Sequence, residues 1–392
     1  MLPETPKRLD AIAPFYVMNL LARARELESQ GHDVIHLEIG EPDFKTPDPV
    51  VEAGIQAMRD GNMGYTAANG IPELRQAIAR FYHQTQSVTV DPNRIFITTG
   101  ASGALQLAML ACLDNDDALL LTEPGYPCNR HIAEALGLAT QVVDLDAKGA
   151  YLPTIDQLSA RANHHTKALL LASPGNPTGS VIPTALMQEV SDLCADNHWH
   201  LIMDEIYSSL VFGGQQAKTV LSVNPGAWVV QSFSKYFQMT GWRLGWLVVP
   251  EGYEAVVSKL AQNLFLSAPT VAQYAAVAAF EPGVMDTLEQ RRRLLASRRD
   301  FLVAGLESIG FPVVAAPDGA FYLYVDVSAY TDDSLAFCTE MLEQAHVAVA
   351  PGLDFGGVDA RTTVRFAYTQ EVDQLSVALT RMGDFIQKWS QK

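Results

Sequence analysis

Gln231-Ser-Phe-Ser-Lys-Tyr-Phe-Gln-Met-Thr-Gly-Trp-Arg-Leu-Gly-Trp246 is the stretch around which this chain is organised. It begins where the apolar run 227–230 ends, and such a run predicts a buried strand. Lys235 therefore falls where a loop leaves the strand. An amine in a partly desolvated pocket has a lowered pKa and can serve as a nucleophile or a Schiff-base partner. An isolated lysine is more often a surface residue, but the pattern of the whole stretch favours a pocket.

The same stretch carries groups that suit an anion. Arg243 lies between Gly241 and Gly245, and glycines allow the backbone to approach a ligand closely. Ser232 and Ser234 add hydroxyl groups beside the lysine. A planar guanidinium and hydroxyls next to a reactive amine suit an aldehyde cofactor that carries a phosphate.

Length, composition and charge exclude several classes of protein. A chain of 392 residues exceeds one ordinary hydrophobic core and predicts two domains. The net charge of −17 argues against a nucleic-acid partner and against an anionic membrane surface. Four scattered cysteines and the absence of His-Glu-x-x-His predict neither disulfides nor a bound metal, and we expect a cytoplasmic protein. No apolar run approaches the ~18 residues of a membrane span, and the N-terminal residues lack the apolar core of a signal peptide.

Between residues 94 and 249, apolar runs alternate with amphipathic helical patterns. Runs rich in Leu, Val and Ile that are bounded by turn formers describe strands covered on both faces. This pattern predicts an α/β fold whose large domain, residues 46–284, holds a mostly parallel seven-stranded sheet sandwiched by helices. The strands are expected at residues 95–98, 118–122, 140–143, 168–172, 199–204, 228–231 and 245–249.

After residue 252 the pattern changes to long helices followed by short strands. A smaller α+β domain is expected from both ends of the chain, residues 1–45 and 285–392, because the alternating block between them is self-contained. The first end contributes a helix at 16–30 and an alternating strand at 34–39. The arginines of the helix expected at 285–308 are interpreted as a solvated face.

Several residues with chemical potential fall at strand ends, where ligands bind in open α/β sheets. Gly100, Ala101 and Ser102 end a strand and open a helix, so they can cradle a phosphate or simply start the helix. Asp204 ends an apolar strand, where a carboxylate needs a cation such as a protonated ring nitrogen, and Tyr207 can reach the same ligand. Taken alone, Asp204 is better explained as a turn cap.

Two rigid loops and an arginine in an apolar stretch complete the set. Asn176 is fixed by a proline- and glycine-rich loop, where its amide can donate to a ligand oxygen and where the Asn176–Pro177 bond is expected to be cis. Tyr126 can stack on a flat ring or pack as a surface aromatic. Arg365 requires an anionic partner, which is either a structural carboxylate or a substrate carboxylate.

Five separated motifs follow one another along the chain: Gly40-Glu-Pro-Asp-Phe44, Ser173-Pro-Gly-Asn-Pro-Thr-Gly179, Asp204-Glu-Ile-Tyr207, Ser232-Phe-Ser-Lys235 and Gly241-Trp-Arg-Leu-Gly245. In this order they closely resemble the class I/II aminotransferases of fold type I, enzymes that use pyridoxal 5′-phosphate. The resemblance extends from the first helix to the last. It is specific, because all five motifs occur in the order found in the family.

The resemblance implies roles for the residues around the cofactor. Lys235 resembles the lysine that binds the cofactor aldehyde as a Schiff base, and Asp204 resembles the partner of the pyridine nitrogen. Tyr207 and Asn176 resemble the groups that bind the phenolic oxygen, and Tyr126 the aromatic residue that stacks on the ring. The phosphate cradle is matched by Gly100, Ala101, Ser102, Ser232 and Arg243.

Further matches imply the substrate site and a partner chain. Arg365 resembles the arginine that binds the substrate α-carboxylate, with Gly40 and Asn176 beside it. Tyr65 lies in the glycine-rich loop 61–70 and resembles the tyrosine that reaches the phosphate of the neighbouring subunit. This match implies a homodimer with shared active sites.

The function implied is transfer of the amino group of an L-α-amino acid to a 2-oxo acid by a ping-pong mechanism, with glutamate and 2-oxoglutarate as one pair. A carbon–sulfur lyase that eliminates at Cβ is the alternative, because both use the same lysine, aspartate and arginine. A transcription regulator would need a DNA-binding module ahead of the fold, and a first helix near Tyr16 leaves no room for one. Phe15 and Tyr16 can either form an apolar wall of a substrate pocket or pack into the core.

Overall fold

Apolar runs form one central seven-stranded sheet, because their side chains can be buried on both faces at once. The computed structural model describes residues 5–213 and 217–389. The strand order is β2-β8-β7-β6-β5-β3-β4, and β8 alone runs antiparallel to its neighbours within this described sheet. The strands are β2 Ile95–Thr98, β3 Ala118–Glu123, β4 Ala139–Asp144, β5 Thr166–Ala172, β6 His200–Asp204, β7 Trp228–Ser232 and β8 Gly245–Val248. The predicted mostly parallel sheet is confirmed, and each strand begins and ends within two residues of the expected positions.

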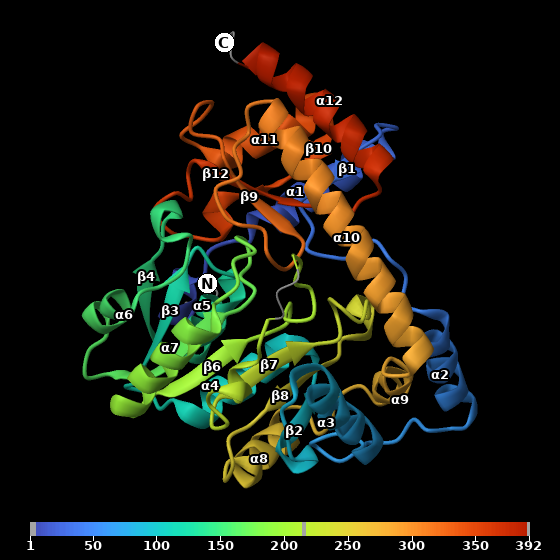
Figure 1. Ribbon diagram of the computed structural model, residues 1–392, viewed down its shortest axis with the longest axis vertical. Coiled ribbons are helices and arrows are strands. Elements are labelled where there is room, and N and C mark those ends of the chain that lie inside the picture. The colour runs from blue at the N-terminus through green and yellow to red at the C-terminus, as the bar shows by residue number, and fades with distance from the viewer. Residues whose placement is uncertain (1–4, 214–216, 390–392) are drawn as a thin grey trace.

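Alternate residues of each strand face opposite sides of the sheet, and both sides are buried. In β5, Leu169 and Leu171 belong to one hydrophobic cluster, whereas Ala168 and Leu170 belong to another. No helix in the described part of the chain is both long and apolar enough to cross a membrane. The helices (Figure 1) are α1 Tyr16–Ser29, α2 Asp48–Arg59, α3 Pro72–Gln86, α4 Gly100–Cys112, α5 Pro127–Leu136, α6 Ile155–Arg161, α7 Thr184–Asp196, α8 Glu254–Leu264, α9 Thr270–Ala278, α10 Pro282–Ser308, α11 Ser334–Ala345 and α12 Val372–Trp389.

The topology brings the loops that follow the parallel strands to one edge of the sheet. Strands β3, β5, β6 and β7 run in the same direction, so their carboxyl ends lie side by side. The loop after β3 carries Tyr126, the loop after β5 carries Asn176, and the turn after β7 carries Lys235. The Asn176–Pro177 bond is cis, as predicted. Residues far apart in sequence thereby become neighbours at this edge.

A second group of strands forms from both ends of the chain. Strands β9 Tyr322–Asp326, β12 Thr363–Ala367 and β11 Ala350–Pro351 make an antiparallel sheet. Strand β1 Ile35–His36 pairs with β10 Val347–Ala348. The strand expected at 34–39 is therefore too long, because the carbonyl of Leu37 already accepts from Ala367 of β12 and the chain then leaves the ladder. Helices α1, α11 and α12 pack around these strands.

Helix α10 links the two sheets, and its arginines do not form the expected solvated face. Figure 1 shows α10 as the long orange helix that runs along one side of the molecule from α9 to α12. Arg298 is only 3% exposed. Its guanidinium pairs with Asp43 at 2.9 Å and with Glu371 at 2.6 Å, and it lies 4.9 Å from the ring centroid of Phe44. The expectation is wrong at this position because the partners come from segments distant in sequence.

Candidate active site

A cavity of about 240 Å³ lies at the carboxyl edge of the central sheet. Strands β9 and β12 of the smaller sheet contribute Tyr322 and Arg365 to its wall, and the N-terminal end of α1 contributes Phe15 and Val17. The sequence-predicted residues that line this cavity are Gly40, Ala101, Ser102, Tyr126, Asn176, Asp204, Tyr207, Ser232, Lys235, Arg243 and Arg365.

The amine of Lys235 enters the cavity from the turn that follows β7. Its Nζ donates a 2.6 Å hydrogen bond to the carbonyl oxygen of Gly40. A Cβ at Gly40 would lie 2.1 Å from the hydroxyl of Tyr322, so the backbone approach requires glycine. Burial, followed by the cation of Arg365, lowers the pKa of Lys235 to about 8. Such an amine has an appreciable neutral fraction near neutral pH and can act as a nucleophile or as a base.

Asp204 ends β6 and is almost completely buried at the wall of the cavity. Burial raises its pKa to about 6, against a 3.3 Å hydrogen bond from the N–H of Ile206 and a hydrogen bond from the side chain of Asn129. Taking a carboxylate out of water is costly unless a cation meets it. The position of Asp204 therefore suits a ligand that carries positive charge.

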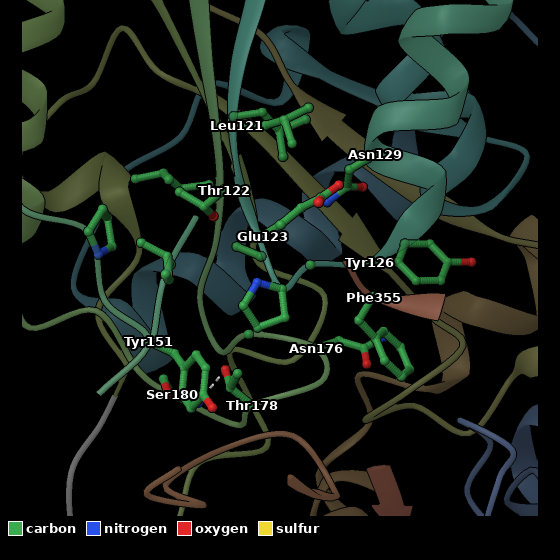
Figure 2. A pocket seen from close by; sticks show the side chains of 18 of the residues that line it. Leu121, Thr122, Glu123, Tyr126, Asn129, Tyr151, Asn176, Thr178, Ser180 and Phe355 are labelled. Carbon is green, nitrogen blue, oxygen red and sulfur yellow. Dashed lines mark hydrogen bonds between the residues drawn. The ribbon is translucent and has the colours of Figure 1, made fainter. Parts of the chain in front are cut away.

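Sequence reasoning missed Asn129, which lies in the first turn of α5 and three residues beyond Tyr126. Figure 2 shows Asn129 above Tyr126, in a smaller neighbouring cavity of about 50 Å³. Its Oδ1 is buried and has no hydrogen-bond partner among the described residues. The spacing of one helical turn from a candidate ring-stacking residue was the available signal, but it is a weak one.

An open place between the N-terminus of α4 and Arg243 has the properties of an anion site. Ala101 and Ser102 line the cavity there, together with Ser232. A Cβ at Gly100 would lie 2.8 Å from an Nη atom of Arg243, so the glycine brings the guanidinium against the helix start. Backbone N–H groups at a helix N-terminus and a guanidinium both attract an anion.

Arg365 is buried on β12 with hydrogen-bond partners that carry no formal charge. One Nη donates to Oδ1 of Asn176 at 2.8 Å and the other donates to the carbonyl of Glu38. Its Nε has no partner among the residues that the structure describes. The rings of Tyr322 and Phe355 lie 4.2 Å and 4.7 Å from the guanidinium carbon and hold its plane. The charge of Arg365 is thus available to an anionic ligand.

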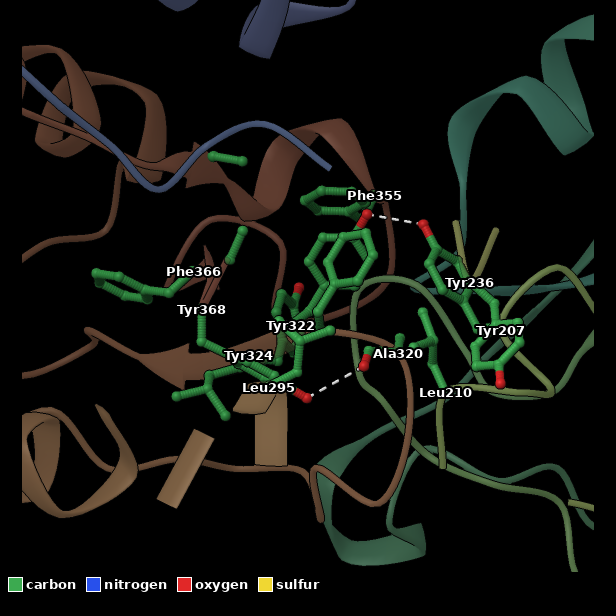
Figure 3. Packing of buried hydrophobic residues seen from close by; sticks show 14 of the residues in the cluster. Tyr207, Leu210, Tyr236, Leu295, Ala320, Tyr322, Tyr324, Phe355, Phe366 and Tyr368 are labelled. Atoms are coloured by element: carbon green, nitrogen blue, oxygen red, sulfur yellow. Dashed lines mark hydrogen bonds between the residues drawn. The ribbon is translucent and has the colours of Figure 1, made fainter. Parts of the chain in front are cut away.

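Two tyrosines complete the wall. The hydroxyl of Tyr207 lies 2.7 Å from the hydroxyl of Tyr322, a hydrogen bond drawn in Figure 3. Burial raises the pKa of Tyr207, so its phenol stays protonated and can donate. Tyr126 faces the cavity, and the ring of Phe15 packs against its edge with the centroids 6.4 Å apart. Sequence reasoning also missed Tyr322, whose hydrogen-bond partner Tyr207 lies 115 residues away in the sequence.

Tyr65 lies outside this cavity, and 84% of its surface is exposed. Its loop is nevertheless held in place by α9. Thr270 Oγ1 donates to the carbonyl of Gly64 at 2.8 Å, and Gln273 Nε2 donates to Thr66 Oγ1 at 3.0 Å. The structure of one chain therefore presents Tyr65 outward on an ordered loop.

Comparison with known proteins identifies the family. The model of the family described as aminotransferase class I and II matches residues 32–382. The chain is a class I/II aminotransferase. It is 39% identical over 376 residues to the valine–pyruvate aminotransferase of Mycobacterium tuberculosis, over 96% of this chain and 97% of that protein. It is 31% identical to the aspartate aminotransferase of Bacillus subtilis, over 98% of this chain and 99% of that one.

Solved structures agree with this assignment. An aminotransferase from Mycobacterium tuberculosis has a TM-score of 0.95 at 38% identity, over 99% of this aminotransferase and 100% of that chain. The aspartate aminotransferase of Thermus thermophilus has a TM-score of 0.91 at 31% identity, over 98% and 100% of the two chains. These relatives are named for amino-group transfer and not for elimination.

This aminotransferase belongs to a family that depends on pyridoxal 5′-phosphate, and the residues present fit that cofactor. The buried carboxylate of Asp204 suits a cationic ring nitrogen, and the glycine-lined place beside Arg243 suits a phosphate. The amine of Lys235 lies on the wall of the same cavity and suits the aldehyde.

Proposed function

We propose that this aminotransferase moves the amino group of an L-α-amino acid with an apolar side chain to a 2-oxo acid. Donor and acceptor use one cavity in turn, which is a ping-pong mechanism. The observation that carries the proposal is the convergence of Lys235, Asp204 and Arg365 on a single cavity. An amine, a buried carboxylate and a free guanidinium are the groups that amino transfer requires from the protein.

The cofactor is assigned to the residues around Lys235. Pyridoxal phosphate, when bound, supplies an aldehyde and an electron-withdrawing ring that together make the Cα proton of the substrate acidic. We assign Lys235 as its attachment point, and Asp204 as the group that holds positive charge on its ring nitrogen. The remaining assignments are Tyr126, Asn176 and Tyr207 for the ring and its phenolic oxygen, and Gly100, Ala101, Ser102, Ser232 and Arg243 for the phosphate.

Lys235 also carries the proton during transfer. Its pKa of about 8 lies close to neutral pH, where a base both accepts and releases a proton readily. The carbonyl of Gly40 accepts a hydrogen bond from this amine and holds it at the wall of the cavity. Arg365, with Asn176 beside it, orients the α-carboxylate of the substrate through charge-assisted hydrogen bonds.

The lining of the cavity supports an apolar substrate side chain. Among the described lining residues the cations are Lys235, Arg243 and Arg365, and each already has a task. A second carboxylate on the substrate would therefore lack a partner from this set. The apolar part of the lining includes Phe15, Val17, Met18, Ile39, Leu105 and Ile206.

For the other half-reaction we propose glutamate and 2-oxoglutarate as the pair, whose second carboxylate would need a cation from outside this set of lining residues, such as one from a partner subunit. Pyruvate is a second candidate acceptor, supported by a specific observation. The relative from Mycobacterium tuberculosis is named for valine and pyruvate. Pyruvate also has no second carboxylate, so it needs no cation beyond Arg365.

Steady-state kinetics of the cofactor-loaded protein test these substrates. Leucine, valine, alanine and aspartate are compared as donors, each with 2-oxoglutarate and with pyruvate. We expect kcat/KM for leucine to exceed that for aspartate by at least about tenfold. A preference for aspartate would contradict the apolar assignment, and the two acceptor series decide between 2-oxoglutarate and pyruvate.

The variant Lys235→Ala tests the central residue. We expect no turnover with any pair, because neither the attachment point nor the base remains. Measured on both proteins without cofactor, its circular dichroism should show nearly intact folding, since the amine is held by a hydrogen bond to the carbonyl of Gly40 and not by an ion pair among the described residues. Turnover at the wild-type rate in this variant would refute the role of Lys235.

The proposal extends to assembly and location. We propose a homodimer in which Tyr65 reaches the phosphate in the active site of the partner subunit. We also propose residues 46–284 as the cofactor-binding domain, and residues 1–45 with 285–392 as the small domain. A cytoplasmic location without nucleic-acid or membrane partners agrees with the net charge of −17.

A further inference from the structure

The N-terminus of α1 is capped from a distant part of the chain. No side chain near Phe15, the residue before the helix, accepts a hydrogen bond from the first turn. The carboxylate of Asp354 does so: Oδ1 accepts from the N–H of Tyr16 at 2.7 Å, and Oδ2 accepts from the N–H of Val17 at 2.8 Å. Asp354 is 7% exposed, and its bond to Val17 is buried whereas its bond to Tyr16 is partly buried. A carboxylate at this end of a helix also complements the helix dipole.

The turn that Asp354 holds forms one wall of the active-site cavity. Phe15, Val17 and Met18 all line it. Phe15 packs edge-on against the ring of Tyr126, which lines the same cavity. Releasing the first turn would therefore move apolar side chains, and would leave the amine of Lys235 where it is.

The residue after Asp354 contacts the arginine that is assigned to the substrate carboxylate. Phe355 lies 4.7 Å from the guanidinium carbon of Arg365, and its carbonyl accepts from the N–H of Gly125 at 2.9 Å. Figure 2 shows Phe355 beside Asn176. Two adjacent residues thus connect the wall for the side chain with the arginine for the carboxylate.

We propose that Asp354 is a positioning residue for substrate specificity, which fixes the first turn of α1 so that Phe15, Val17 and Met18 pack against an apolar substrate side chain. This inference rests on the proposed function. Asp354 touches neither the reacting atoms nor the substrate. It acts through the helix, and its loss affects substrates according to how far their side chains extend.

The variant Asp354→Asn tests the proposal. The amide has the shape of the carboxylate but places an NH₂ group against one of the two N–H donors, so one bond is lost. We expect the ratio of kcat/KM for leucine to that for alanine to fall about tenfold, mainly through KM for leucine. Alanine has no side chain that reaches the wall, so its constants report any general damage to the site.

A matched control is Asp333→Asn. Asp333 caps α11 by accepting from the N–H of Ala336 at 3.1 Å, and no residue of α11 lines the cavity. It loses a helix cap of the same chemistry and should keep the leucine-to-alanine ratio of the wild type. A ratio in Asp354→Asn within about twofold of the wild type would overturn the proposal.

Hydrogen exchange supplies a measurement that does not depend on turnover. We expect the amides of Tyr16 and Val17 to exchange about tenfold faster in Asp354→Asn than in the wild type, and not in Asp333→Asn. Unchanged exchange at both amides would overturn the role of Asp354 whatever the substrates are. Faster exchange in a protein whose wild type does not use leucine would instead refute the proposed substrate class.

Discussion

Burial raises the pKa of Asp204 and lowers the pKa of Lys235, two residues that line the same cavity. Burying the charged form of either group reduces the stability of the folded protein. The pKa of Asp204 is raised from 3.8 to about 6, and that of Lys235 is lowered from 10.5 to about 8. Each shift means that the folded protein resists the charged form of the group. A cationic ring nitrogen beside Asp204 would relieve one of these costs. A functional role therefore accounts for the presence of these two buried ionisable groups, which reduce stability.

We therefore expect Asp204→Asn to stabilise the cofactor-free protein and to inactivate the enzyme. Because the folded-state pKa is raised, the favourable contribution of Asp204 is complete below pH 3.8 and is lost as pH rises through about 6. Well above pH 6 the ionised group opposes folding, so removing it should raise the free energy of unfolding by about 1–3 kcal/mol. Urea denaturation measures this gain. Turnover should fall about 100-fold or more.

Glu205 offers a matched control for the same prediction. Burial raises its pKa to about 7, and its Oε1 accepts from the N–H of Val220 at 2.7 Å. It does not line the cavity. Glu205→Gln should therefore change stability in the same direction but keep most of the turnover. A destabilised Asp204→Asn, or one that remains active, would show that the carboxylate has a structural task.

The sequence was sufficient to predict the site residues that follow strand ends, but it was insufficient to predict the residues that contact and position them. Lys235, Asp204 and Asn176 could be predicted because each follows an apolar run whose carboxyl end has a known place in a parallel sheet. Tyr322 could not be assigned, because its role depends on a contact with Tyr207 across 115 positions. The distant capping of α1 escaped prediction for the same reason.

Helix α10 contacts two aromatic rings, each through a pair of arginines spaced seven residues apart. Residues at this spacing lie on one helix face, and Arg291 and Arg298 lie 5.3 Å and 4.9 Å from the ring centroid of Phe44. The next pair, Arg292 and Arg299, lies 5.9 Å and 5.1 Å from the centroid of Phe212. Phe44 belongs to the loop that follows Gly40, and Phe212 to the segment that follows Tyr207. Helix α10 thus holds two loops of the active site at once.

We expect Arg298→Met to lower the free energy of unfolding by about 3 kcal/mol, because it leaves Asp43 and the carbonyl of Thr369 without their buried partner. Arg293→Met on the same helix is the control: its side chain is 73% exposed, and the change should stay within ~0.5 kcal/mol. Chemical denaturation of both variants measures the difference. Equal stability of the Arg298→Met and Arg293→Met variants would show that the contacts of Arg298 with the Phe44 loop do not stabilise the fold.

Helices and strands could be predicted where the pattern of apolar residues within the segment itself determines them. The helix at α10 follows from its periodicity, and its observed start at Pro282 precedes the expected one by three residues. The burial of its arginines does not follow, because Phe44 and Phe212 arrive from other parts of the chain. The extents of the short strands were harder to predict, since two residues carry too little pattern: the strand expected at 34–39 contains β1 but exceeds its two residues.

Two segments of the chain that meet at the start of α9 carry apolar side chains that face solvent. Met63 and Tyr65 are exposed in the loop that α9 holds, Leu264 is exposed at the end of α8, and Leu266 is exposed between α8 and α9. Exposed apolar side chains in two segments joined by the Thr270–Gly64 hydrogen bond favour a protein interface over a free surface. We predict that the partner is a second copy of the chain, because that copy would also give Tyr65 a task.

We therefore predict that Leu266→Asp converts a dimer into a monomer and weakens binding of pyridoxal phosphate at the same time. The charge cannot be buried against a second apolar surface, and the monomer loses the partner's tyrosine from its phosphate site. Light scattering after size exclusion measures the mass, and fluorescence titration measures the affinity.

Tyr65→Phe should remain dimeric but bind the cofactor about tenfold more weakly, because one hydrogen bond to a charged group is lost. Val377→Asp on α12, at the other end of the molecule in Figure 1, should change neither quantity. A Leu266→Asp monomer with wild-type affinity would refute shared active sites, and a monomeric wild type would refute the dimer itself.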